Sequence, residues 1–340
     1  MKKKNIIKTW LDNARSSSSV QSVMPAVLTL VLAIGQENFS LWLGLLAIVG
    51  VWAAHMAVNL VDDLFDYKAD MLKDREQVVR RGFKAYTAKY PYLTDGSATV
   101  KDLWMAIFAF AAIALVCGVV IAIFRGWEIL IIAAITAFLG VFYSAPPIKF
   151  CYWGMGELVT GFIFGPLLMA GVWWASAGSF DPWILSVSVP VGLLVINILY
   201  THSMIDREGD AASDKMTLAG LLHFSWLKLL ASFVFNFGPF IIFAVSVALG
   251  ILHPLYLVVL LALPRPIWLF WSLVRFEQGK DIDKELEKPR KMLGNMGDWP
   301  TYRKAGLDWF LIRWLTARNI VSAFCVLTIL VHVIIVIFIR

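Results

Sequence analysis

Two short stretches of this chain concentrate aspartates at helical spacing, one at residues 59–70 (NLVDDLFDYKAD) and one at 206–214 (DREGDAASD). Their aspartates are Asp62, Asp63, Asp66, Asp70, Asp206, Asp210 and Asp214. Residues three, four or seven apart lie on one face of a helix, so each stretch would present several carboxylates in one direction. Carboxylates crowded at a helix C-terminus repel one another and the helix dipole. A cation is therefore expected to compensate them.

The chemistry that suits such clusters is the binding of a metal and a diphosphate. Mg²⁺ prefers hard oxygen ligands, takes one or two protein carboxylates and completes its coordination with water and phosphate oxygens. Three basic residues in nearby segments, Lys149, Arg207 and Lys215, would bind the outer oxygens of that phosphate. The pattern predicts aspartates joined through Mg²⁺ to a diphosphate, and a diphosphate substrate beside lipid implies a prenyl chain.

The elements that must position these residues are membrane helices. Of the 340 residues, 59% are apolar and only 16% are charged, which is typical of an integral membrane protein. Apolar windows of about 20 residues predict nine transmembrane helices. These windows are 20–36, 41–61, 101–124, 127–143, 155–176, 181–201, 224–250, 253–274 and 319–339. Pro264 and Pro266 are expected to kink or break the eighth span.

Basic residues predict how these spans are oriented. Lys and Arg collect in the segment before the first span and in the connection after the second, whereas the connections after spans 1, 5 and 7 have none. Because positive loops stay in the cytoplasm, we expect a multi-pass protein of the cell (inner) membrane with a cytoplasmic N-terminus. Spans 2 and 6 then both end at the cytoplasmic face, with an aspartate cluster each. The orientation of the protein in the membrane and its contact with anionic lipids account for the excess of Lys and Arg over Asp and Glu. No nucleic-acid partner is expected.

We expect one transmembrane domain spanning residues 1–340. Within it, 1–18 reads as an interfacial N-terminal segment, and the segments 66–99 and 203–222 as cytoplasmic connections that carry the aspartate motifs. The segment 275–304 reads as a charged cytoplasmic loop whose alternating charges are typical of a solvated face, and it is assigned no chemistry.

The motifs resemble those of a known family. Asp62, Asp66 and Asp70, followed by Asp206 and Asp210, resemble the NxxxDxxxD and DxxxD motifs of the UbiA superfamily of intramembrane prenyltransferases. The Arg15 to Pro25 spacing and YSAPPIK at 143–149 extend the resemblance. WGMGE at 153–157, FGP at 164–166 and the KMTLA run at 215–219 are similar to the menaquinone branch, which prenylates 1,4-dihydroxy-2-naphthoate.

The resemblance implies an all-α bundle of nine transmembrane helices with a cytoplasm-facing active site. It implies that Mg²⁺ holds a polyprenyl diphosphate, and that an aromatic acceptor such as 1,4-dihydroxy-2-naphthoate attacks the allylic cation formed as the diphosphate leaves. The implied catalytic residues are Asp66, Asp70, Asp206 and Asp210. The implied metal ligands are the same four with Asp62 and Asp63. The implied substrate-binding residues are Asn59, Tyr143, Lys149, Arg207 and Lys215.

Several alternatives stay open at this point. Asp62 stands where the branch usually has Asn, and HSMID at 202–206 where NNIRD is common, which leaves room for another acceptor or for a terpene cyclase. From a different class, a cation-coupled transporter would also use carboxylates, although transporters place them near the bilayer midplane. His55 is either a packing residue or a substrate contact, and Glu157 reads as a carboxylate that complements a helix N-terminus.

Overall fold

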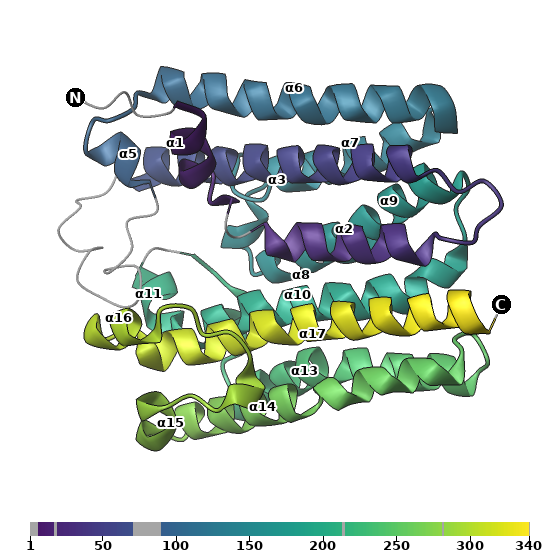
Figure 1. The fold of residues 1–340 in the computed structure, drawn as a ribbon. Helices are drawn as coiled ribbons and strands as arrows, with labels where there is room; N and C mark the ends of the chain where they lie inside the picture. The colour runs from purple at the N-terminus through teal and green to yellow at the C-terminus, as the bar shows by residue number, and fades with distance from the viewer. Residues whose placement is uncertain (1–5, 17–18, 71–89, 213–214, 281, 340) are drawn as a thin grey trace. The chain divides into compact units, whose positions relative to one another are not determined.

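The computed structural model describes residues 6–16, 19–70, 90–212, 215–280 and 282–339. All regular elements in these ranges are helices (Figure 1). The chain folds into two compact units. The first unit comprises Met1–Cys151 and Leu167–Phe180, and the second comprises Tyr152–Pro166 and Asp181–Arg340.

Six helical segments are long and apolar enough to cross a membrane, so the chain is a multi-pass membrane protein. They are Leu41–Lys68, Val100–Arg125, Gly156–Ala177, Pro182–Ile205, Ser225–Ala248 and Asp308–Phe338. A seventh candidate, Pro254–Ala262 with Pro264–Glu277, is bent by 41°. The predicted break of the eighth span is therefore confirmed.

Two further predicted spans coincide with shorter apolar helices, Val20–Leu32 and Glu128–Val141. At 1.5 Å per residue, helices of 13 and 14 residues reach about 20 Å, less than the roughly 30 Å of a bilayer core. The count of nine spans stays a prediction.

The first unit is built around one long helix, α3 (Leu41–Asp70), which packs along α6 (Figure 1). Its other helices are α1 (Ile6–Asn13), α2 (Val20–Leu32), α5 (Pro91–Thr94), α6 (Val100–Arg125), α7 (Glu128–Val141) and α9 (Leu168–Ala177). A capping box between Thr99 and Asp102 begins α6. Met56, Leu60 and Leu64 on α3 are fully buried beside α5 and α6. Apolar packing therefore holds the end of α3 that carries the aspartates.

The second unit is arranged around α10 (Leu185–Ile205), which packs against α8, α13 and α17. Its other elements are α8 (Gly156–Phe162), η4 (Ile163–Leu167, whose last residue belongs to the first unit), η5 (Pro182–Ile184), α11 (Arg207–Ala212), α12 (Leu218–Leu221), α13 (Ser225–Ala248), η6 (Pro254–Ala262), α14 (Pro264–Glu277), α15 (Asp283–Glu287), η7 (Lys291–Leu293), α16 (Trp299–Lys304) and α17 (Asp308–Phe338). A Cβ on Gly165 would lie 2.5 Å from the Ser188 carbonyl oxygen. Glycine at this position therefore allows the backbone to approach α10 closely.

The helices extend further than the apolar windows predicted. α3 continues nine residues beyond residue 61, through the aspartate cluster to Asp70. Likewise, the predicted loop 275–304 contains α15 and α16. Hydropathy reports where side chains suit lipid, whereas a helix also continues through charged residues that suit water, so the two boundaries differ.

Candidate active site

The first aspartate cluster occupies the last three turns of α3. Asp63 and Asp66 are buried, with 0% and 5% of their surface exposed, and Asp62 is half-buried. The side chain of Asp70 lies outside the described part of the chain. Asn59, one turn earlier, donates from Nδ2 to the Ala14 carbonyl at 2.9 Å. The predicted substrate residue Asn59 thus fastens the segment after α1 to α3.

An ion pair holds Asp63 in place. Arg15 donates from Nη1 to Oδ1 of Asp63 at 2.5 Å and from Nη2 to the Asn59 carbonyl at 3.0 Å. The Tyr92 hydroxyl donates to Oδ2 of Asp63 at 2.9 Å. Burial alone would lower the pKa of Arg15, but the Asp63 and Asp62 carboxylates raise it above its ordinary value. Asp63 is therefore an anchoring carboxylate in this structure, besides being a predicted metal ligand.

Tyr143 and Lys149 lie on one loop of the first unit. Backbone bonds close it: the N–H of Phe150 donates to Phe142 at 3.0 Å, and that of Cys151 to Tyr143 at 2.9 Å. Lys149 has φ of 54°, in the left-handed region that few residues other than glycine adopt. Such a conformation costs on the order of 1 kcal/mol or more and is common at functional sites. The loop closure holds the Lys149 backbone in this conformation.

The second cluster follows α10 directly. Asp206 is the C-cap residue of α10, Asp210 lies on α11, and both are buried, with 2% and 5% exposed. Backbone bonds continue the turn, because the Asp210 N–H donates to Asp206 and the Lys215 N–H to Asp210. A Cβ on Gly209 would lie 2.5 Å from Oδ1 of Asp206. Glycine at 209 therefore leaves room for the Asp206 carboxylate.

Glu157, on α8, is a buried carboxylate that connects three segments of the second unit. Its Oε1 accepts from the Ser203 hydroxyl at 2.7 Å, and both of its oxygens accept from the Leu218 N–H, at 3.2 and 3.3 Å. This role goes beyond the predicted complement to a helix N-terminus. WGMGE, which contains Glu157, and the KMTLA run, which contains Leu218, are both part of the family resemblance, but only the fold brings Glu157 to Leu218.

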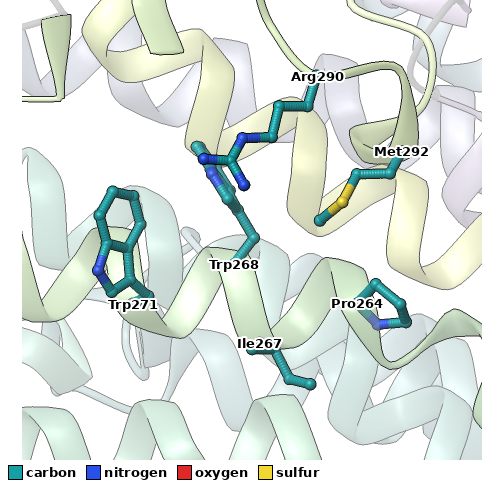
Figure 2. Close-up of a pocket in the computed structure, with 6 residues that line it drawn as sticks. All are labelled: Pro264, Ile267, Trp268, Trp271, Arg290 and Met292. Carbon is teal, nitrogen blue, oxygen red and sulfur yellow. The ribbon is translucent and has the colours of Figure 1, made fainter. Parts of the chain in front are cut away.

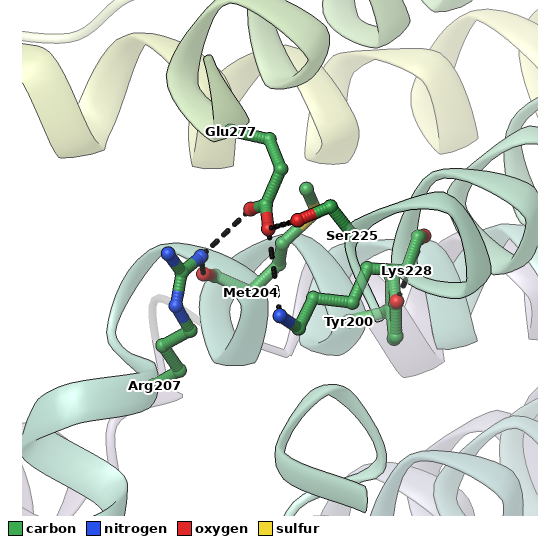
Figure 3. A network of polar contacts seen from close by, with 6 residues as sticks. All are labelled: Tyr200, Met204, Arg207, Ser225, Lys228 and Glu277. Carbon is green, nitrogen blue, oxygen red and sulfur yellow. Dashed lines mark hydrogen bonds and ion pairs between the residues drawn. The ribbon is translucent and has the colours of Figure 1, made fainter. Parts of the chain in front are cut away.

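Arg207 is part of a polar network on the same unit (Figure 3). Its Nη1 donates to Oε2 of Glu277 at 2.8 Å. Oε1 of Glu277 accepts from the Ser225 hydroxyl at 2.7 Å and from Nζ of Lys228 at 3.4 Å. Glu277 is the third residue of the predicted loop 275–304, to which the sequence analysis assigned no chemistry. That interpretation overlooked Glu277, because a single charged residue at the end of an apolar helix gives no sign of its partners.

The remaining predicted basic residue, Lys215, lies with Nζ 5.3 Å from the ring centroid of Tyr152. This is a cation–π distance, and both residues belong to the second unit. His55, in the first unit, contacts the Ser22 hydroxyl at 2.8 Å through Nδ1. This contact fits a packing role for His55, and a substrate contact stays the other prediction.

Comparison with known proteins identifies the family. Residues 22–296, most of the chain, match the model of the UbiA prenyltransferase family. The chain belongs to this family. It is accordingly a prenyltransferase, and the family resemblance seen in the aspartate motifs is confirmed.

Relatives within the UbiA family include naphthoate enzymes. The chain is 25% identical over 260 residues to a 1,4-dihydroxy-2-naphthoate octaprenyltransferase of Bacillus subtilis, covering 74% of this chain and 78% of the relative. It is 32% identical over 117 residues to a 2-carboxy-1,4-naphthoquinone phytyltransferase of Synechocystis, covering 34% and 38%. A UbiA homologue from Archaeoglobus fulgidus bound to DMAPP and Mg²⁺ shares the fold, with a TM-score of 0.56 and 15% identity over 92% of this chain and 99% of that one.

The carboxylates of this UbiA-family chain suit a hard cation. The predicted donors are carboxylate oxygens, which Mg²⁺ prefers to softer nitrogen or sulfur ligands. Among the residues that the structure describes, no three His, Cys, Asp or Glu side chains group closely enough to hold a metal by themselves. Mg²⁺ typically takes one or two carboxylates and relies on substrate phosphate oxygens for the rest.

A pocket of about 530 Å³ in the second unit lies between α14 and the segment around η7 (Figure 2). Its lining residues are Pro264, Ile267, Trp268, Trp271, Arg290 and Met292. Arg290 also pairs with Glu285 at 3.0 Å. None of the predicted site residues lines this pocket, so it forms no part of the candidate active site.

Proposed function

We propose that this UbiA-family enzyme transfers a polyprenyl group from its diphosphate to an aromatic acceptor, 1,4-dihydroxy-2-naphthoate or a similar quinone precursor, in a Mg²⁺-dependent reaction. The observation that carries the proposal is that two long membrane helices, α3 and α10, each lead into buried carboxylates at helical spacing. The naphthoate substrates in the relatives' names and the DMAPP and Mg²⁺ bound by the solved homologue support it.

In this proposal the carboxylates have one shared task. Those that would hold Mg²⁺ are Asp62, Asp63, Asp66 and Asp70 from the first unit and Asp206 and Asp210 from the second. When bound, Mg²⁺ supplies Lewis-acid stabilisation of the departing diphosphate. The basic residues Lys149, Arg207 and Lys215 bind outer phosphate oxygens as point charges or through guanidinium N–H groups. Asn59 and Tyr143 complete the substrate contacts.

We further propose that the chain is one nine-span domain in the cell inner membrane, with its N-terminus and active site at the cytoplasmic face. The distribution of basic residues and the parity of spans 2 and 6 support this placement. Single cysteines at Ser97 and at Ser213, in a chain without its three native cysteines, test it with a membrane-impermeant reagent on intact cells. Protection of both positions is expected, and labelling of either from outside contradicts the proposal.

The identity of the acceptor is the most specific part of the proposal. Ser203 stands where the menaquinone branch commonly has Asn, and its hydroxyl is engaged by Glu157. His202 packs edge-on against Phe310, with ring centroids 5.0 Å apart. Because these partners lie within the second unit, contacts inside that unit account for His202 and Ser203, and the proposal keeps the naphthoate acceptor.

Product analysis tests the proposed reaction. Purified protein in lipid nanodiscs is incubated with labelled polyprenyl diphosphate and Mg²⁺, in three arms: 1,4-dihydroxy-2-naphthoate, 4-hydroxybenzoate and no acceptor. Prenylated naphthoquinol with release of CO₂, lost when EDTA replaces Mg²⁺, is the expected result. Prenylated hydroxybenzoate alone would point to another acceptor, and a cyclised hydrocarbon without acceptor to a terpene cyclase. Either of these outcomes, or the absence of product in all three arms, overturns the proposed reaction.

A further inference from the structure

We propose that Glu277 is a positioning residue that fixes α11, and with it the carboxylates of Asp206 and Asp210, by holding Arg207. This inference rests on the proposed function and adds to it a residue outside both aspartate motifs. Glu277 lies on α14, 70 residues after Arg207 in the chain.

The contacts of Glu277 are those of an anchor. Its side chain is only 5% exposed, and Arg207 reaches it from α11 while Lys228 reaches it from α13. Figure 3 shows the guanidinium of Arg207 and the ammonium of Lys228 directed at the one carboxylate. A buried carboxylate with two cations and a hydroxyl donor is strongly held, because charge-assisted hydrogen bonds are about twice as strong as neutral ones. The Glu277 carboxylate therefore holds the first residue of α11 in place.

Helix α11 needs a contact with another helix to hold it in place. It has only six residues, including Gly209, and a helix this short is not stable on its own. Arg207 is its first residue, follows Asp206 directly and precedes Asp210 by three positions, which is one helical turn. Its Nη1 also donates to the Met204 carbonyl at 3.4 Å, and its Cζ lies 5.7 Å from the ring centroid of Phe276. Holding Arg207 thus sets the start of the turn on which both carboxylates lie.

The variant Glu277→Gln distinguishes a positioning role from competition with the diphosphate, because the two roles predict opposite changes in the KM for prenyl diphosphate. If Glu277 merely competes with the diphosphate for Arg207, removing its charge frees Arg207 and lowers the KM for prenyl diphosphate. If Glu277 positions α11, the same change loosens the carboxylates. We then expect the KM for prenyl diphosphate and the half-saturating Mg²⁺ concentration to rise by about tenfold, roughly one charge-assisted hydrogen bond, with kcat at saturating Mg²⁺ largely kept.

Two further variants control the experiment. Glu285→Gln removes the exposed ion pair with Arg290, in the same 275–304 segment, and is expected to leave KM, kcat and Mg²⁺ dependence unchanged. Glu277→Gln also leaves Lys228 buried beside a neutral amide, which destabilises the protein. The double variant Glu277→Gln with Lys228→Met removes that charge and should recover the melting temperature of the parent while keeping the raised KM and Mg²⁺ requirement.

The result can fail in two distinguishable ways. An active parent enzyme whose Glu277→Gln variant shows an unchanged or lower KM and Mg²⁺ requirement overturns the positioning role. So does recovery of both constants in the double variant, because the shift would then follow from lost stability alone. A parent protein that forms no product at any Mg²⁺ concentration instead overturns the proposed function on which the inference rests.

Discussion

The two units fasten their aspartate motifs with the same kind of contact but with the charges reversed. In the first unit the carboxylate belongs to the motif: Asp63 on α3 accepts from Arg15, which comes from the segment after α1. In the second unit the cation belongs to the motif segment: Arg207 on α11 donates to Glu277, which comes from α14. Each carboxylate also accepts from one hydroxyl, that of Tyr92 or that of Ser225.

This reversal shows that a charged residue inside a motif can hold its own segment in place, whatever it also does to the substrate. Asp63 uses both oxygens in its anchor, and Arg207 gives one guanidinium nitrogen to Glu277. Removing the partner has opposite electrostatic consequences, because it takes a positive charge away from Asp63 in the first unit and a negative charge away from Arg207 in the second. Electrostatics alone would therefore weaken diphosphate binding in Arg15→Gln and strengthen it in Glu277→Gln. Loss of positioning weakens it in both.

The largest effect is expected from the carboxylates assigned to the metal. Asp66→Asn and Asp210→Asn each remove a hard anionic ligand at nearly constant shape, so product formation should fall about 1,000-fold, several kcal/mol of charge stabilisation, while the protein stays folded in detergent. Turnover and melting temperature are measured for each. Activity within about tenfold of the parent in either variant contradicts the metal assignment. A loss in only one unit would show that the two motifs are not equivalent.

The next effect tests the anchor of the first unit. Arg15→Gln removes the positive charge paired with Asp63, whose carboxylate has no exposed surface, and taking the partner away from a buried charge costs about 3 kcal/mol. The free energy of unfolding, measured by denaturant titration in mixed micelles, should fall by about that amount. Lys101→Gln, at an exposed position near the start of α6, is the matched control and should change it by less than about 0.5 kcal/mol. Equal losses in the two variants would remove the anchoring role of Arg15.

The sequence predicted the parts of this arrangement that depend on local spacing. The aspartates recur at helical intervals, so their common face could be read directly, and Pro264 predicted the break between η6 and α14. The family motifs then indicated the prenyltransferase class, which the family match confirms. These features depend on residues within a few turns of one another.

The partners of the buried charges could not be predicted. Arg15 and Asp63 lie 48 residues apart, Glu157 and Ser203 46, and Arg207 and Glu277 70. The packing of the helices decides which distant cation pairs with a given carboxylate. No local pattern in a single sequence reports that packing. A single Glu beside a charged loop therefore reads as solvated until the fold shows it buried.

A smaller effect is expected from the lysines, of which each unit contributes one. Lys149→Ala and Lys215→Ala should each weaken prenyl diphosphate binding about tenfold and acceptor binding little, because a lysine acts on phosphate as a point charge. Calorimetry with a non-hydrolysable diphosphate analogue measures diphosphate affinity, and the KM for the acceptor reports acceptor binding. Lys101→Ala serves as the control. Unchanged affinity in both variants would indicate that these lysines face lipid headgroups instead.

The smallest effect compares the two hydroxyl donors. Tyr92 is 4% exposed and donates from its hydroxyl to Oδ2 of Asp63, so Tyr92→Phe removes one hydrogen bond from a fully buried carboxylate oxygen, at a cost of about 1 kcal/mol. The ring, which packs edge-on against Trp10 at 5.8 Å, is kept. Ser225→Ala removes an exposed bond to Oε1 of Glu277, which still accepts from Lys228, and should cost only a few tenths of a kcal/mol.

Both losses are measured by the same denaturant titration. Burial also raises the pKa of Tyr92, and Asp63 raises it further, so this phenol stays protonated and continues to donate across the working pH range. The difference between the two variants should therefore be the same at pH 6 and at pH 9 (roughly the range in which an unperturbed phenol stays protonated). If Ser225→Ala cost as much as Tyr92→Phe, burial would not be what distinguishes the two anchors.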